Sequence, residues 1–193
     1  VFDPGETWAA RNSPVHKKFN YMHDEKDIIG HMTASLIMLP DGNVYNESQV
    51  PDKYDIVVAS VLYRHWSDKD LQQRMDDIIN GIAEGKWYVS MECLFKHFDY
   101  AIKTPEGQNK VVARNHESAF LTKHLRAYGG TGEYDGYKVG RFLRNFTYSG
   151  KGLVDNPGNP RSIIFKNVDV FNNVKADFSF QKKGKVNMSG ENQ

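Results

Sequence analysis

The chain has 193 residues with 25 basic and 24 acidic side chains, a balance that does not favour a nucleic-acid-binding protein. This length indicates one domain with a core that needs no disulfides, and Cys93, the single cysteine, excludes an internal bridge and suits a reducing compartment. No apolar run reaches the roughly 18 residues of a membrane span, and no signal peptide is visible after Val1.

The first part of the chain predicts an arm, two strands and a helix. Residues 1–20 are polar and predict an extended N-terminal arm. Apolar side chains alternate along residues 28–39, a period of two that predicts a strand. The continuous apolar run 56–63 predicts a buried strand. A capping box that begins at Ser67 then predicts a helix, which ends at Gly85.

The second part predicts mainly strands. In chain order these elements are a strand over 86–102, a return strand over 110–114, a second helix capped by Asn115, a loop over 129–141, strands over 142–148 and 162–171 with a turn-rich loop between them, and a polar tail from 182.

Six or seven strands and two helices predict a β-rich α+β fold, a closed β-barrel or sheet surrounded by helices. We expect an extended arm over residues 1–20, a folded domain over 21–181 and a flexible C-terminal tail over 182–193.

Two residues are candidates for nucleophilic catalysis. A serine hydroxyl is a poor nucleophile unless a base lies within hydrogen-bonding reach. Ser90 stands in the predicted strand after Gly85, and His23 ends the element Asn20-Tyr21-Met22-His23, with Ile29-Gly30 shortly after it. A further element, Leu153-Val154-Asp155-Asn156-Pro157-Gly158-Asn159-Pro160, follows near the end of the predicted domain.

These three elements, in this order, resemble those of the prohead maturation proteases of tailed phages, which are related to the herpesvirus assemblins. Residues 119–130 and 140–144 look most like the T-even branch. The resemblance implies an assemblin-like barrel whose domain over 21–181 is a serine endopeptidase, with Ser90 as nucleophile and His23 as base.

The same resemblance implies the biological setting. The substrates would be scaffold or core proteins and the major capsid protein, cut after glutamate inside the assembling prohead in the host cytoplasm. No cofactor, nucleic acid or membrane is implied. Self-cleavage at Glu84-Gly85 is expected to be slow, because Ile82 and Glu84 fit the predicted helix.

The third catalytic residue is open. The assemblins use a second histidine, and His116, 26 residues after Ser90, is favoured over its neighbour Glu117. Asp99 is a further candidate, although alternation places it on the opposite face of the strand from Ser90. Arg114, Arg126 and the Gly150–Gly152 stretch are open candidates for the oxyanion hole.

Three other interpretations compete with a serine protease. Cys93 with His65 or His97 could form a cysteine hydrolase, although a cysteine among apolar neighbours is more often a core residue. The second interpretation is a metal-binding protein, but the seven histidines show no metal-binding spacing. The main alternative is a non-catalytic structural phage head protein that keeps the protease-like fold.

Overall fold

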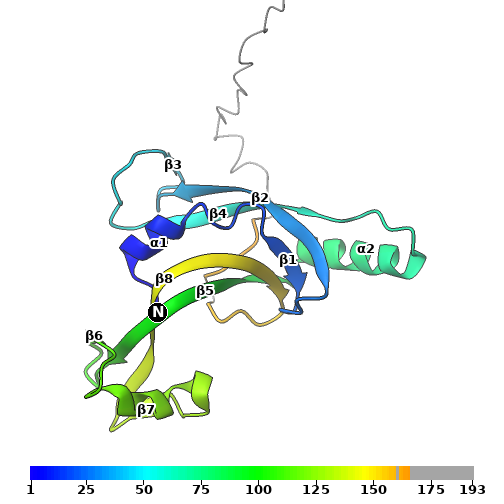
Figure 1. Cartoon of the computed structure of the whole chain (residues 1–193). Helices are drawn as coiled ribbons and strands as arrows, with labels where there is room; N and C mark the ends of the chain where they lie inside the picture. Colours follow the sequence, from blue (N-terminus) through cyan, green and yellow to red (C-terminus); the bar gives the residue numbers. More distant parts are fainter. Residues whose placement is uncertain (160, 166–193) are drawn as a thin grey trace, which may run out of the picture.

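The computed structural model describes residues 1–159 and 161–165, which form an α+β fold on an eight-stranded mixed sheet (Figure 1). The β-rich α+β class is therefore confirmed. The elements are α1 (Pro4–Ala10), β1 (Lys18–Tyr21), β2 (Ile28–Met38), β3 (Val44–Tyr45), β4 (Asp55–Leu62), α2 (Lys69–Glu84), β5 (Tyr88–Lys103), β6 (Asn109–Val112), the 3₁₀ helices η1 (Ala119–His124) and η2 (Arg126–Tyr128), β7 (Glu133–Tyr134) and β8 (Tyr137–Val154).

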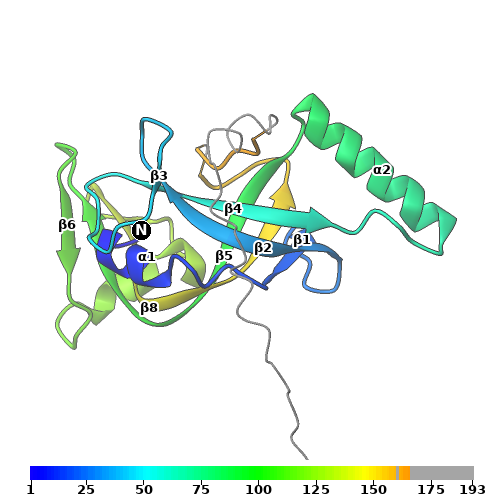
Figure 2. The same cartoon turned by 90° about the horizontal axis from the view of Figure 1, so that it is seen from above.

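The sheet is open, so the prediction of a closed barrel of six or seven strands was wrong. The strand order is β3-β2-β1-β8-β5-β6, with β4 paired to β2 and β7 paired to β8. The β1–β8 pair is parallel and every other pair is antiparallel. No ladder joins β4 to β5 within the described residues, and the sheet curls without closing (Figure 2).

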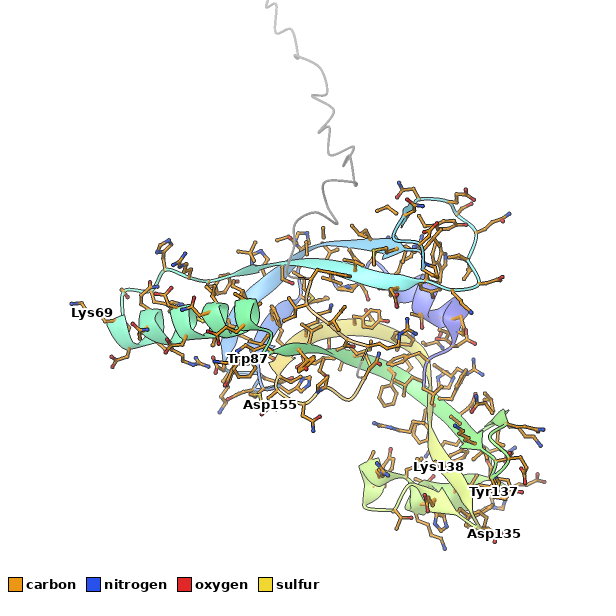
Figure 3. All side chains as sticks on the ribbon, turned by 180° about the vertical axis from the view of Figure 1, so that it is seen from behind. Lys69, Trp87, Asp135, Tyr137, Lys138 and Asp155 are labelled. Carbon is orange, nitrogen blue, oxygen red and sulfur yellow. The ribbon has the colours of Figure 1, made fainter. Side chains whose placement is uncertain are left out.

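The two longest strands, β5 and β8, form the backbone of the molecule. They pair from Tyr88↔Val154 to Lys103↔Lys138, with one register shift between Glu92 and Cys93. At one end of this ribbon lie Trp87 and Asp155, and at the other lies the hairpin with Asp135, Tyr137 and Lys138 (Figure 3). The predicted strand over 142–148 is thus only the middle of β8, and the glycine-rich stretch after it is strand rather than loop.

The N-terminal arm is folded, contrary to the prediction that it is extended. Asp3 accepts a hydrogen bond from the Glu6 N–H and caps α1, and proline at the first helical position favours this start. Phe2 forms a β-bridge with Leu143, and β1 ends the arm inside the sheet.

Helix α2 confirms the predicted helix but not its predicted cap. Asp68, rather than Ser67, accepts hydrogen bonds from the N–H groups of Asp70 and Leu71. Gly85 ends the helix in the left-handed region with φ 78°, as its lack of a Cβ allows. Glu84 is therefore the last helical residue, which agrees with the expected protection of the Glu84–Gly85 bond.

The predicted second helix is replaced by two short 3₁₀ helices, η1 and η2. Asn115 accepts hydrogen bonds from the N–H groups of Glu117 and Ser118, so it stabilises a turn before η1. The predicted loop over 129–141 contains the β7–β8 hairpin.

Two apolar clusters stabilise the fold. One lies between the β5–β8 ribbon and η1, and includes Tyr100, whose hydroxyl shares a 2.7 Å hydrogen bond with the Thr122 Oγ1. The other packs Met75 and Ile78 of α2 against the sheet, and its buried sheet residues are Phe19, Ile29 and Leu153. This second cluster therefore joins α2 to β1, β2 and β8.

The predicted strand over 162–171 is not a strand over residues 162–165, and its remainder lies outside the described residues, as does the predicted tail over 182–193. No helix in the described part of the chain is long and apolar enough to cross a membrane.

Gly30→Ala is expected to destabilise the fold. A Cβ at Gly30 would lie 2.1 Å from the Val61 carbonyl oxygen in the β2–β4 ladder, so the strands would have to separate. We expect a loss of about 1–3 kcal/mol in the free energy of unfolding, measured by urea denaturation. Gly140→Ala is the control, because the nearest atom to its Cβ would lie 3.9 Å away. Equal losses in the two variants would contradict this packing argument.

Candidate active site

The two sequence candidates, Ser90 and His23, meet at the central strand β8. Gly152 of β8 is paired with Asn20 of β1 on one side and with Ser90 of β5 on the other. Two residues away, Gly150 is paired with Lys18 and Glu92 in the same manner. Residues opposite one another in a ladder share a face of the sheet, and so do residues two apart along a strand. Ser90, Glu92 and Asn20 therefore lie on one face.

His23 reaches this face from a tight turn directly after β1. The Asp24 N–H donates to the Tyr21 carbonyl at 2.9 Å, and the two residues between them, Met22 and His23, both have positive φ, 52° and 61°. This conformation is unfavourable for residues with a Cβ, at about 1–2 kcal/mol each. Strain of this kind is typical of functional sites, where surrounding contacts maintain it.

Glu92 is the partner of His23. The His23 Nδ1 lies 2.9 Å from the Glu92 Oε1, and the Asn20 Nδ2 donates to the same oxygen at 2.7 Å. The Lys18 Nζ lies 3.7 Å from the other carboxylate oxygen. Partial burial acts to raise the pKa of Glu92, but these hydrogen bonds and the Lys18 ammonium outweigh it, so the pKa is lowered.

The ionised carboxylate determines the tautomer of His23. A carboxylate can only accept, so the His23 Nδ1 carries the proton and donates it to Glu92. Among the described residues the His23 Nε2 has no hydrogen-bond partner. Glu92 is 17% exposed and His23 is 41% exposed, so the pair has one partly buried member and one member open to solvent.

The two glycines of β8 provide the space for this pair. A Cβ at Gly152 would lie 2.8 Å from the His23 Nδ1, and a Cβ at Gly150 would lie 2.4 Å from the Glu92 Oε2. Any other residue at these positions would displace the imidazole or the carboxylate. The Gly150-Lys151-Gly152 stretch is thus the floor of the site.

Ser90 is half-buried in the same row as Gly152, although the described residues show no hydrogen bond between its hydroxyl and His23. Hydrogen bonds between catalytic groups are often long or poorly aligned without substrate. The geometry thus brings a hydroxyl, an imidazole and a partly buried carboxylate to one face of three adjacent strands.

The structure does not bring His116 to this site. His116 is exposed and follows β6, which pairs with β5 only from Tyr100 onwards. Ten residues of β5 separate Tyr100 from Ser90, about 33 Å at the usual rise of a strand. Glu117 lies beside His116, and Asp99 accepts hydrogen bonds from the Arg114 N–H and the Arg144 Nε. Glu92 occupies the position that we expected one of these residues to fill.

Of the sequence candidates for an oxyanion hole, the two arginines lie elsewhere and only the Gly150–Gly152 stretch lies at the site. The Arg114 guanidinium stacks on the Phe98 ring at 4.5 Å, and the Arg126 Nε donates to the Thr131 carbonyl, both towards the far end of β5. Gly150 and Gly152 lie in a strand with a partner on each side, so ladder hydrogen bonds engage their backbone groups.

Cys93 has the environment of a packing residue. It packs against the cluster of Phe98 and Tyr100, and burial raises the pKa of its thiol despite the opposing charge of Arg141. A raised pKa reduces the fraction of reactive thiolate, which disfavours a cysteine hydrolase. In the described residues, no group of three or more His, Cys, Asp or Glu side chains is arranged to hold a metal ion.

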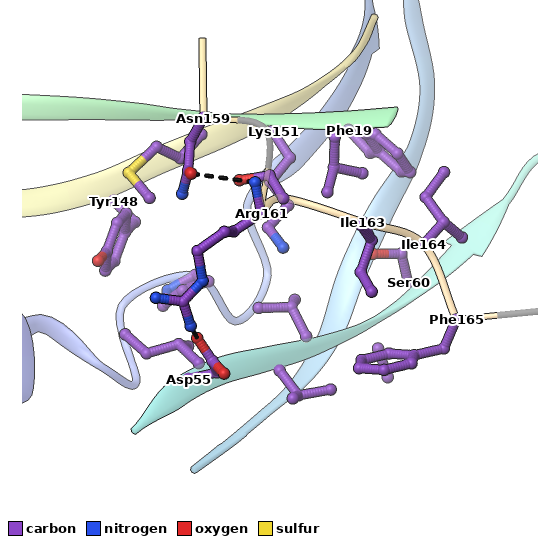
Figure 4. Close-up of a pocket in the computed structure, with 18 of the residues that line it drawn as sticks. Phe19, Asp55, Ser60, Tyr148, Lys151, Asn159, Arg161, Ile163, Ile164 and Phe165 are labelled. Atoms are coloured by element: carbon purple, nitrogen blue, oxygen red, sulfur yellow. Dashed lines mark hydrogen bonds and ion pairs between the residues drawn. The ribbon is translucent and has the colours of Figure 1, made fainter. Parts of the chain in front are cut away.

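The opposite face of the sheet encloses a separate cavity of about 800 Å³ (Figure 4). Its walls come mainly from β4, β5, β8, Asn159 and residues 161–165, and Arg161 spans it to pair with Asp55 at 3.1 Å. Lys151 also lines the cavity, and burial lowers the pKa of this lysine to about 8. Neither Ser90 nor the His23–Glu92 pair lines the cavity.

In comparisons with known proteins, no protein-family model, curated protein or solved structure matches the chain.

Gly152→Ala is expected to separate His23 from Glu92. The new methyl group would take the place of the imidazole, so the Nδ1–H resonance that the carboxylate protects from exchange should disappear from the NMR spectrum. Gly140→Ala should leave this resonance unchanged, because Gly140 lies in the same strand at a position with room for a Cβ. An intact His23 resonance in the Gly152→Ala protein would contradict the role of Gly152 as the floor of the site.

Glu92 should make the stability of the protein depend on acid pH. Its pKa is lower in the folded state than the ordinary 4.5. The folded state therefore binds this proton less readily, and the resulting stability is present above about pH 4.5 and lost as pH falls through the lower folded pKa. Urea denaturation of the wild type and Glu92→Gln from pH 6 to 3 should show unfolding free energies that converge as pH falls. A constant difference would contradict the lowered pKa.

Proposed function

We propose that the chain is a serine endopeptidase in which Ser90 is the nucleophile, His23 the general base and Glu92 the residue that orients His23. The observation that carries the proposal is the His23–Glu92 hydrogen bond above Gly152, in the same cross-strand row as Ser90. A carboxylate, an imidazole and a hydroxyl in this order are the components of a catalytic triad.

The proposed reaction follows from the protonation states. The Ser90 Oγ attacks the peptide carbonyl while its proton passes to the His23 Nε2, and the Glu92 carboxylate stabilises the resulting imidazolium. The tetrahedral intermediate collapses, the C–N bond breaks, and the imidazolium donates its proton to the leaving amine. Water then attacks the acyl-enzyme with His23 again as base. The bond between the acyl carbon and the Ser90 Oγ breaks, the imidazolium returns its proton to this oxygen, and the carboxylic acid product departs.

The substrate class that we propose is the scaffold and major capsid proteins of a tailed phage, cut during prohead maturation in the host cytoplasm. Support comes from the three motif elements over residues 20–160 that resemble the prohead proteases. The support from the fold is that two of these elements lie beside one another: Asn20 and His23 contact Glu92, and Ser90, which ends the second element, is paired with Gly152. We include an assemblin-like arrangement of the strands in the proposal. The sheet of this chain differs from a closed barrel in that it is open.

The nucleophile is tested with an alkyl fluorophosphonate, which reacts covalently with activated serines. Intact-mass spectrometry should show one adduct, mapped to the peptide with Ser90, and cuts in a peptide library should disappear in Ser90→Ala and His23→Ala. A wild-type protein that is folded but neither labelled nor able to cut peptides would contradict the proposal and favour the non-catalytic head protein.

The third residue is tested by comparing Glu92→Gln with His116→Ala. The neutral amide of the Glu92→Gln protein cannot stabilise an imidazolium, so the rate of fluorophosphonate labelling should fall by about 10²- to 10⁴-fold. His116→Ala should be labelled at the wild-type rate, because His116 lies at the far end of β5. The reverse result would restore His116 and remove Glu92 from the mechanism.

A further inference from the structure

The turn that carries His23 depends on contacts outside itself. Its ends are joined by a hydrogen bond from the Tyr21 N–H to the Asp27 carbonyl at 3.0 Å, and the Asp27 N–H donates to the Asp24 carbonyl at 3.2 Å. Inside this closed loop Met22 and His23 both adopt positive φ, which residues with a Cβ disfavour. A strained loop of this kind keeps one conformation only where neighbouring groups fix it.

Arg74 of α2 contacts both ends of this loop. Its Nη1 donates to the Asp27 Oδ1 at 3.0 Å and its Nη2 to the Asp27 Oδ2, so the guanidinium binds the carboxylate with two parallel hydrogen bonds. The same guanidinium stacks on the Tyr21 ring at 4.8 Å. Arginine alone combines these two geometries, since a lysine ammonium can neither bind in this bidentate manner nor stack as a plane.

The contact continues to the strand of the nucleophile. Tyr21 packs edge-to-face on Trp87 at 5.4 Å, and Trp87 stands three residues before Ser90. The Trp87 indole in turn lies against α2 at Gly81, where a Cβ would come within 2.5 Å of its ring nitrogen. Helix α2 therefore contacts the His23 loop through Arg74 and the start of β5 through Trp87.

We propose that Arg74 is a positioning residue, which fixes the His23 loop so that the imidazole stays hydrogen-bonded to Glu92 over Gly152. This inference rests on the proposed serine protease function. Arg74 touches neither substrate nor the reacting atoms, and it acts through the orientation of His23. Small displacements of a catalytic group reduce reaction rates by about 10- to 100-fold, so we expect a loss of this size in the rate of labelling.

The matched control is a second ion pair to the same helix. Arg64, in the segment between β4 and α2, donates from its Nε to the Oδ1 of Asp76 on α2 at 3.0 Å, and it makes no hydrogen bond to Asp27. Arg64→Gln thus removes a comparable α2 ion pair and leaves the loop contacts in place. Asp27→Asn is a second test variant, because it preserves the shape of the side chain and loses only its charge.

The experiment measures fluorophosphonate labelling of Ser90 in the full chain, separated into the binding constant and the maximal rate. Arg74→Gln and Asp27→Asn should lower the maximal rate about 10- to 100-fold with the binding constant unchanged, and Arg74→Lys should recover part of it. The two losses should not add in the double variant, because both remove the same contact. Arg64→Gln should react like the wild type, and the His23 Nδ1–H resonance should be weakened in the Arg74→Gln and Asp27→Asn proteins alone.

The outcomes separate this inference from the function on which it rests. A wild-type protein that is not labelled refutes the proposed function, and the inference with it. A wild-type protein that is labelled, together with Arg74→Gln and Asp27→Asn proteins that react at the rate of Arg64→Gln, overturns the role of Arg74 while the proposed function stands. If Arg74→Gln does not fold, the Asp27→Asn rate alone decides between these results.

Discussion

The site depends on the absence of side chains at two positions of the central strand. β8 lies between β1 and β5, so Gly150 and Gly152 each have a neighbour about 4.8 Å away on both sides. The ladders fix the position of Ser90, Glu92 and Asn20 to within the tolerance of backbone hydrogen bonds. The imidazole of His23 then occupies the volume that a side chain at Gly152 would fill. The placement of the proposed catalytic groups therefore follows from strand register and from these two glycines.

The two faces of the sheet at this point differ in polarity. On one face, Glu92 is kept ionised by hydrogen bonds and by Lys18, which allows the pair with His23 to form without an isolated buried charge. On the other face, Phe19 and Leu153 pack against α2. Because alternate residues of β1 and β8 serve the two faces, a shift of register by one residue would exchange the polar and the apolar set.

The sequence predicted His23 and Ser90, because their motif elements are local, whereas it missed Glu92. Glu92 follows Ser90 by two residues in a predicted strand, so alternation alone placed both on one face. The spacing along the chain that the resemblance implies pointed instead to His116, which the length of β5 carries away from the site. Gly150 and Gly152 were assigned to a loop because glycine favours turns, but strands on both sides override this preference. Closure of the barrel could not be predicted, since periodicity identifies strands and not the pairing of the last strand with the first.

Two separate parts of the fold position the two side chains that we propose as nucleophile and base. Ladder hydrogen bonds place Ser90, and they extend over the whole length of the β5–β8 ribbon. His23 lies on a strained turn that is held by the Met22 N–H, which donates to the Leu153 carbonyl at 2.9 Å, and by the contacts of Arg74 with Asp27 and Tyr21, which are far fewer than those of the ribbon. Local stability within a fold decreases as buried contacts and protected hydrogen bonds become fewer. The base should therefore be the first element of the site to lose its position when the protein is perturbed, while the nucleophile stays in place. Any ligand or partner that displaces α2 would change the orientation of His23 before it changes the fold.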